Sequence, residues 1–220
     1  MGSTPEYRYL HSNERQQLNI TLEAMTLRSI LLTALLLTML TGWQADTPTR
    51  FVFTEASALW VTGTSTVHDW RCNAAQVDGW LNTNAGEALT GITQAEVTVQ
   101  ADGLECKNGT MDKKTRNALK ADEHPTIRYE LTAAEVLPGT EKGFRVQTTG
   151  RLTLAGQTHT VTATVQGQVT PNGQIRLMGE LPIVMSDYGI NPPTAMLGTL
   201  KTGNAVTVHF EVVAAPASGL

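Results

Sequence analysis

The densest group of reactive side chains runs from Thr64 to Trp70, where a serine, a histidine and an aspartate lie close together. These are the residue types of a hydrolytic triad, so nucleophilic catalysis is the first chemistry to consider. On an extended strand, however, Ser65 and Asp69 face one way and His68 the other, so the three groups converge only at a sharp bend. We favour a strand corner whose side chains bond to local backbone groups, and we predict that the protein is not an enzyme.

Signatures of the common zinc, phosphate, dinucleotide and calcium sites are missing from the chain. It contains no HExxH, no P-loop, no GxGxxG and no EF-hand loop. His124 follows Asp122 and Glu123 just before a proline, a pattern more typical of a solvated loop than of a metal site. The 20 acidic residues outnumber the 16 basic ones, and the basic residues do not supply the positive surface that phosphates require. We therefore expect no cofactor, no metal and no nucleic-acid partner.

Beyond the N-terminal region, apolar and polar residues alternate with the period of strands that have one buried face. In segment 158–165, His159 and Val161 share the apolar side opposite the threonines, so His159 is expected in the core. Segment 206–213 repeats the pattern with Phe210 facing inward. Turn-forming residues fall between such segments, and amphipathic helices do not. The chain is therefore predicted to be all-β, as an antiparallel sandwich or a closed barrel.

Two segments interrupt the strands. Residues 112–121 predict a short helix, with Asp112 as its N-terminal cap and Leu119 packing against the core. Residues 187–203 contain two prolines and cannot form a central strand, although they are rich in apolar side chains. The flexible apolar residues in and beside this segment are predicted to form a lid or portal: Met185, Ile190, Met196 and Leu197.

The N-terminal region has the three parts of a secretory signal peptide. Arg28 precedes an apolar run at residues 30–40, and small and polar residues follow it. The run is too short to cross a bilayer, which needs about 20 apolar residues. We predict that translation starts at Met25, that residues 1–45 form an extension and signal peptide, and that residues 46–220 form one domain. The mature protein is then periplasmic or secreted, without stable insertion in a membrane.

The chain has only two cysteines, Cys72 and Cys106. They are too few for a Cys₄ zinc site and too far apart for a CxxC redox pair. Export to an oxidising compartment favours a disulfide between them. The alternative is two buried free thiols.

Four segments together resemble the YceI-like family. They are residues 60–70 (WVTGTSTVHDW), 119–129 (LKADEHPTIRY), 150–161 (GRLTLAGQTHTV) and 186–190 (SDYGI). The likeness extends over residues 50–213, with the segments in the family's order and spacing. It implies an extended, lipocalin-like antiparallel barrel with one short helix. It also implies an exported protein that binds polyisoprenoids and similar amphiphiles.

Two features depart from the family pattern: the loop after Asp187 and the pair Cys72 and Cys106. The predicted function is an exported binder or carrier of a long apolar lipid, a polyisoprenoid or an isoprenoid-quinone-like amphiphile, held inside the barrel. The alternative is an extracellular β-domain with a filled core that binds a protein partner. The tryptophans either pack in the core or line an apolar chamber. The candidate ligand contacts are Trp60, Trp70, Trp80, Leu119, Tyr129, Phe144, Val161, Met185, Ile190, Met196, Leu197 and Phe210.

Overall fold

The computed structural model describes residues 49–84, 91–140, 143–195 and 199–217. The predicted signal peptide and the boundary at residue 45 lie outside the described residues. The strands are β1 (Thr49–Phe53), β2 (Ala58–Ser65), β3 (Trp70–Ala74), β4 (Asp78–Thr83), β5 (Ile92–Gln100), β6 (Leu104–Glu105), β7 (Thr126–Thr140), β8 (Gly143–Leu154), β9 (Gln157–Val169), β10 (Ile175–Val184), β11 (Thr194–Ala195) and β12 (Leu200–Pro216). The helices are the 3₁₀ helices η2 (Ala101–Gly103) and η3 (Met185–Tyr188) and the α-helix α2 (Gly109–Ala118).

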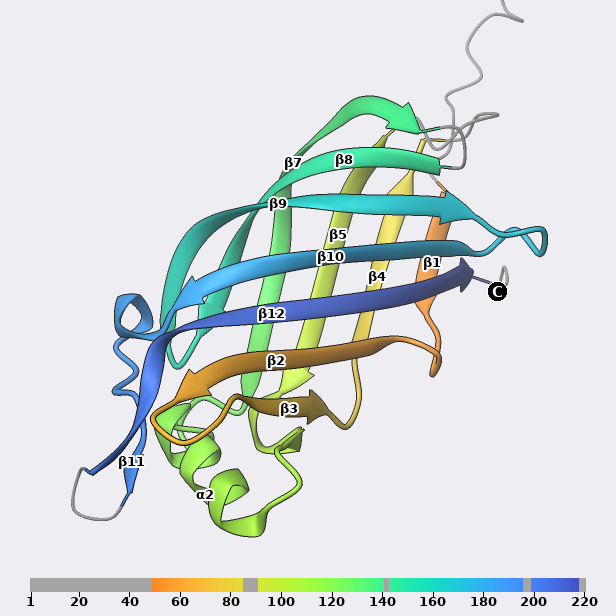
Figure 1. The fold of residues 1–220 in the computed structure, drawn as a ribbon. Helices are drawn as coiled ribbons and strands as arrows, with labels where there is room; N and C mark the ends of the chain where they lie inside the picture. Colours follow the sequence, from red (N-terminus) through yellow and green to blue (C-terminus); the bar gives the residue numbers. More distant parts are fainter. Residues whose placement is uncertain (1–48, 85–90, 141–142, 196–198, 218–220) are drawn as a thin grey trace, which may run out of the picture. The chain divides into compact units, whose positions relative to one another are not determined.

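The strands pair antiparallel and close into a ring. The ring order is β1-β4-β5-β7-β8-β9-β10-β12, and β12 pairs back to β1, with Phe53 opposite Ala214. In the described part of the chain this is an eight-stranded barrel. Along most of its length β12 also pairs with β2, and β3 and β6 continue the sheet from there. Figure 1 shows the long strands curving around the interior, with α2 beside β3 at one end. The predicted all-β barrel with one short α-helix is confirmed.

The alternation of side chains along the strands is confirmed, with one exception. Val206, Val208 and Phe210 of β12 point into the barrel, and His209 points outward, where its Nδ1 lies 3.2 Å from a Glu180 oxygen. The exception is His159, which is exposed like the other three residues at the start of β9. Its ring instead contacts that of Tyr188 edge-on, at 4.8 Å between centroids. The prediction of a core histidine was therefore wrong.

The helix begins three residues earlier than the sequence predicted. Asn108, not Asp112, is the N-terminal cap, because its side chain accepts hydrogen bonds from two backbone N–H groups of the first turn. The Asp112 carboxylate accepts a hydrogen bond from the Cys106 backbone N–H instead, at 2.6 Å. Leu119 follows the last helical residue and is buried, as expected.

Turn residues with left-handed backbone explain two of the hairpins. The β8–β9 hairpin turns on Ala155 and Gly156, both with left-handed backbone (φ 49° and 80°), as a two-residue turn between twisted strands requires. The predicted turn ending at Gly173 (φ 73°) is also present. The predicted turn at Pro138 is wrong: this residue lies within β7, where the pairing with β8 shifts register and so tolerates a missing N–H.

Two apolar clusters lie toward the two ends of the barrel interior. The first, beside α2 and η3, includes Leu104, Leu119 and Tyr188. The second, at the opposite end, includes Phe51 and Ile175. The helices among the described residues are all too short or too polar to span a membrane. Residues of both clusters line the candidate site.

Candidate functional site

The interior of the barrel is hollow. A cavity of about 480 Å³ runs between the sheet walls, and every strand of the eight-stranded ring contributes to its lining. The wall is almost entirely aliphatic and aromatic, with Leu81, Val97, Leu152, Val165 and Val208 among its members. The volume falls within the usual range for small-molecule sites, roughly 300–1,000 Å³. An apolar chamber of this kind suits an apolar ligand and offers few groups that could stabilise developing charge.

Glycines in the wall help to explain why the cavity is not filled by aromatic side chains. Five inward-facing rings each cover a glycine on a neighbouring strand, and a Cβ atom on that glycine would overlap the ring. Because the glycine has no side chain, the ring occupies the space against the sheet and not the centre of the lumen. The pairs are Phe53 with Gly79, Trp70 with Gly63, Tyr129 with Gly150, Phe144 with Gly167 and Phe210 with Gly179.

One layer of side chains closes the end of the cavity remote from α2. Each residue of this layer is buried and does not line the cavity. The residue two positions away on the same strand does line the cavity. Since alternate residues share a face, this layer lies directly below the last lining residues. We call it the floor, and it consists of Phe51, Thr83, Val146, Ile175 and Ala214.

The other end of the cavity opens to the surface beside α2. Val67 lines the cavity and is 63% exposed, so the cavity reaches solvent there. His68, Thr194 and Lys201 are the other exposed residues of the lining, and all four come from this end. Lys114 of α2 also lines it and donates a hydrogen bond from Nζ to the Thr194 carbonyl oxygen, at 2.9 Å. We call this opening the mouth; it combines an apolar interior with polar groups at its rim.

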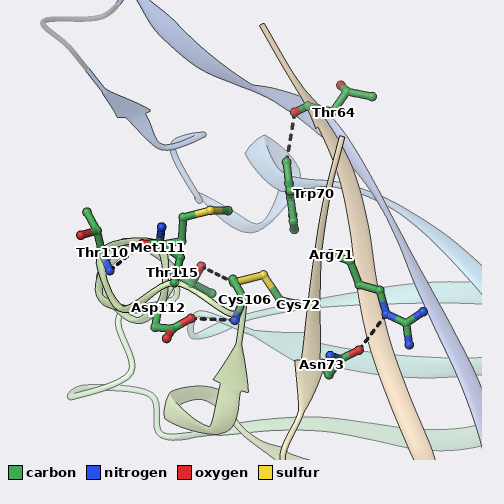
Figure 2. Close-up of a disulfide and its surroundings, with 11 residues drawn as sticks. Thr64, Trp70, Arg71, Cys72, Asn73, Cys106, Thr110, Met111, Asp112 and Thr115 are labelled. Carbon is green, nitrogen blue, oxygen red and sulfur yellow. Dashed lines mark hydrogen bonds between the residues drawn. A yellow bond between two sulfur atoms is a disulfide. The ribbon is translucent and has the colours of Figure 1, made fainter. Parts of the chain in front are cut away.

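A disulfide between Cys72 and Cys106 fixes one side of the mouth, as the export argument predicted. Figure 2 shows it joining β3 to the segment just before α2, with Asp112 and Thr115 of the helix directed toward Cys106. The Cys106 Sγ lies 3.5 Å from the Thr115 hydroxyl, which supplements the Asp112 hydrogen bond. Cys72 itself lines the cavity. The disulfide therefore anchors the N-terminal half of α2 to the barrel wall.

The Ser65, His68 and Asp69 cluster is a turn at the rim. The Ser65 hydroxyl donates to the His68 carbonyl oxygen at 2.7 Å and accepts from the His68 N–H at 3.2 Å. The His68 Nδ1 lies 2.7 Å from the Asp69 carbonyl oxygen. The side chains of Ser65 and His68 thus bond to backbone groups and not to each other, as the strand-corner interpretation predicted.

Tyr129 supplies a polar atom within the apolar wall. Its hydroxyl is buried and has no hydrogen-bond partner among the described residues, and burial raises the pKa of this phenol above its ordinary value of 10.0. The nearby Thr148 side chain opposes that rise in pKa, but its own hydroxyl donates to the Ala163 carbonyl oxygen at 3.1 Å. The pKa of Tyr188 is also raised, first by burial and then by the charge of Asp187. The Tyr129 phenol is therefore held neutral within the wall.

The structure brings most of the sequence-predicted contacts together and separates others. Those that line the cavity are Trp70, Leu119, Tyr129, Val161, Met185, Ile190 and Phe210. Phe144 is not part of the lining and packs against the second apolar cluster. Met196 and Leu197 lie outside the described residues.

Trp60 and Trp80 do not line the cavity, because their strands put the neighbouring residues inward. Trp60 stacks on the His209 ring at 5.3 Å, and the Arg71 guanidinium lies 4.4 Å from its centre. Trp80 is covered by the Arg50 guanidinium at 4.1 Å. We therefore remove both tryptophans from the candidate site.

Sequence reasoning missed the glycines and the basic residues at the mouth. The glycines stand on inward-facing positions of strands, where they break the apolar alternation, and this was the available signal. Lys114 and Lys201 gave no signal, since each lies in a polar stretch of ordinary composition.

Solved structures of low sequence identity share this fold. The chain resembles BcnA of Burkholderia cenocepacia, with 16% identity, a TM-score of 0.61, and coverage of 74% of this chain and 99% of BcnA. It also resembles a polyisoprenoid binding domain from Saccharophagus degradans, with 14% identity, a TM-score of 0.60, and coverage of 78% and 100%. It resembles the YceI protein of Campylobacter jejuni as well, with 15% identity, a TM-score of 0.53, and coverage of 67% of this chain and 85% of that protein. No curated protein matches the sequence.

The family is shown by the sequence itself. The model of the YceI-like domain matches residues 43–214, which is most of the chain and includes every strand of the barrel except the last residues of β12. The match contains the cavity lining, the floor and the mouth. The protein therefore belongs to the YceI-like family.

Proposed function

We propose that this protein is an exported binder or carrier of a long apolar lipid, a polyisoprenoid or an isoprenoid-quinone-like amphiphile, held in the barrel interior. The observation that carries the proposal is the apolar cavity of about 480 Å³ with one polar mouth. Burial of each methylene contributes about 0.8 kcal/mol, so ten buried methylenes supply about 8 kcal/mol. That is enough for micromolar binding before the cost of ordering the ligand. Binding, rather than catalysis, is what this wall supports.

The relatives support the ligand class. The domain from Saccharophagus degradans is described as polyisoprenoid binding, and it aligns with this chain over its whole length. The cavity of this chain has the apolar wall that such a ligand requires. The alternative, a protein-interaction module with a filled core, is less well supported. The interior is hollow, and Ile190 and Pro193 of the segment after η3 contribute to the cavity wall.

Export is the part of the proposal that rests on the cysteines. A disulfide between Cys72 and Cys106 persists in an oxidising compartment, such as the periplasm or the extracellular space. The predicted signal peptide in residues 1–45 would deliver the chain there. We therefore propose a periplasmic or secreted location.

A matched pair of variants tests the binding site. Ala163 lines the cavity, and Thr162, the adjacent residue, is exposed on the outer face of β9. We expect Ala163→Trp to fill the lumen and reduce the affinity for the apolar fluorescent probe N-phenyl-1-naphthylamine by at least about tenfold. Thr162→Trp adds the same side chain outside and should leave the affinity unchanged. Equal probe affinity in both variants, with melting temperatures like the wild type, would place binding elsewhere.

A further inference from the structure

The floor divides the barrel interior into a filled part and an empty part. Phe51, Thr83, Val146, Ile175 and Ala214 are 7%, 2%, 0%, 1% and 0% exposed, so the layer is tightly packed. Each stands one inward-facing step below a lining residue: Phe53, Leu81, Thr148, Leu177 and Val212 respectively. A chain that enters at the mouth therefore meets a solid end.

The cavity is long. On β12 the lining runs from Leu200 at the mouth to Val212 above the floor. Twelve residues at about 3.4 Å each, on a strand tilted by about 40° from the barrel axis, span about 31 Å along that axis. An apolar chain can therefore extend from the mouth to the floor.

The distance from the mouth to the floor limits the length of that chain. Each isoprene unit adds four bonds along the chain, about 5 Å when extended, so a length of about 31 Å holds at most about six units. Polar groups that can face a headgroup, including Lys114, Lys201 and His68, lie at the mouth. The chain end therefore points to the floor.

We propose that the floor makes this barrel selective for chain length, so that it encloses at most about six isoprene units of an extended chain and leaves any further units outside the mouth. The inference rests on the proposed function and refines it. The affinity for a prenyl chain should rise with every isoprene unit that is buried in the cavity. It should stop rising once the chain end reaches the floor, because the remaining units stay in water.

A homologous series of prenyl alcohols tests the proposal. Alcohols with two, three, four, six and eight isoprene units would be assayed on the full domain by displacement of N-phenyl-1-naphthylamine. We expect the affinity to rise at least about tenfold from two units to four and to change less than about threefold from six units to eight. A steady rise through eight units would overturn the length proposal but leave the lipid-binding function standing. No displacement by any alcohol would overturn the proposed function itself.

Variants of the floor sharpen the test. Phe51→Ala removes a six-carbon ring from the floor and should extend the rise in affinity by about one isoprene unit. Val52→Ala, on the outer face of the same strand, is the matched control and should leave the series unchanged. Leu177→Trp adds bulk just above the floor and should shorten the preferred chain by about one unit. This second variant tests the proposal even if Phe51→Ala does not fold. An unchanged series in a folded Leu177→Trp protein would contradict the proposal.

Discussion

At the scale of single residues, the glycines beneath the aromatic rings determine how much of the lumen stays open. Gly150 lies under the Tyr129 ring, and the ring occupies the position that a Cβ atom would take. Any side chain at this glycine must displace the ring toward the centre of the cavity. The same geometry applies to the four other pairs, so the volume of the cavity depends on residues that themselves bind nothing.

Gly150→Ala is predicted to reduce ligand binding without touching the ligand. We expect the affinity for N-phenyl-1-naphthylamine to fall about tenfold and the free energy of unfolding to fall by about 1–3 kcal/mol, because the ring must leave its packed position. Gly109→Ala is the control, since a Cβ atom at this first residue of α2 meets no atom within 4 Å. Unchanged probe affinity in Gly150→Ala would show that the glycine does not maintain the lumen.

The buried Tyr129 hydroxyl predicts how the stability of the protein depends on pH. Because burial raises the pKa of this phenol in the folded state, its contribution to stability is fully present below pH 10.0, the ordinary value. It is lost as the pH rises through the higher pKa of the folded state. Urea unfolding at about pH 8 and about pH 11 should therefore show a smaller alkaline loss of stability in Tyr129→Phe than in the wild type.

The same variant should be more stable at neutral pH. Removing a buried hydroxyl that lacks a partner should raise the free energy of unfolding by about 1 kcal/mol. The alkaline loss will not disappear entirely, because the pKa of Tyr188 is raised as well. A larger alkaline loss in Tyr129→Phe than in the wild type would contradict the assignment.

At the scale of elements, α2 depends on two attachments to the barrel. The Cys72–Cys106 disulfide holds the segment before the helix, and Lys114 bonds to the Thr194 carbonyl across the mouth. The helix has no fully buried residue of its own, so its packing alone contributes little to its position. We therefore expect its placement to respond to loss of either attachment.

Removal of the disulfide should lower stability substantially. The two cysteines are 34 residues apart, and closing a loop of that size contributes about 4 kcal/mol in the chain-entropy model. Urea unfolding of the double variant Cys72→Ala, Cys106→Ala should show a loss of this order. A loss below about 1 kcal/mol would mean that the disulfide does not restrain the unfolded chain as that model requires.

Loss of the Lys114 hydrogen bond should act on ligand release. In Lys114→Met the helix is no longer tied to Thr194, so we expect faster dissociation of a bound prenyl alcohol in stopped-flow measurements, with less than about 1 kcal/mol change in stability. Lys113→Met is the matched control, because Lys113 is exposed and does not line the cavity. Equal dissociation rates in the two variants would remove Lys114 from the mouth's function.

The elements themselves were largely predictable, and their boundaries were not. Period-two alternation is a local property, so the strands around Val161 and Phe210 could be found from the sequence alone. The helix start depended on whether Asn108 or Asp112 capped it, and both residue types cap well. Only the distant contact of Asp112 with the Cys106 N–H decided between them.

At the scale of the whole molecule, the hollow interior is the property that sequence patterns could not supply. The position of Tyr129 over Gly150 depends on the register between β7 and β8, which residue types alone do not specify. The same limit applies to Trp60, whose outward orientation follows from the phase of β2 rather than from its spacing to the other tryptophans. Family resemblance indicated a barrel, and the register of the strands determines what that barrel can hold.

The central claim is that the barrel carries an apolar chain in its interior, and extraction of the protein as the cell delivers it tests this most directly. The mature protein would be purified without detergent, extracted with organic solvent and analysed by mass spectrometry, with the lumen-filled Ala163→Trp variant processed in parallel. We predict that the wild type releases close to one equivalent of a prenyl lipid and that the filled variant releases much less. Equal recovery of lipid from both proteins, or none from the wild type, would contradict the claim.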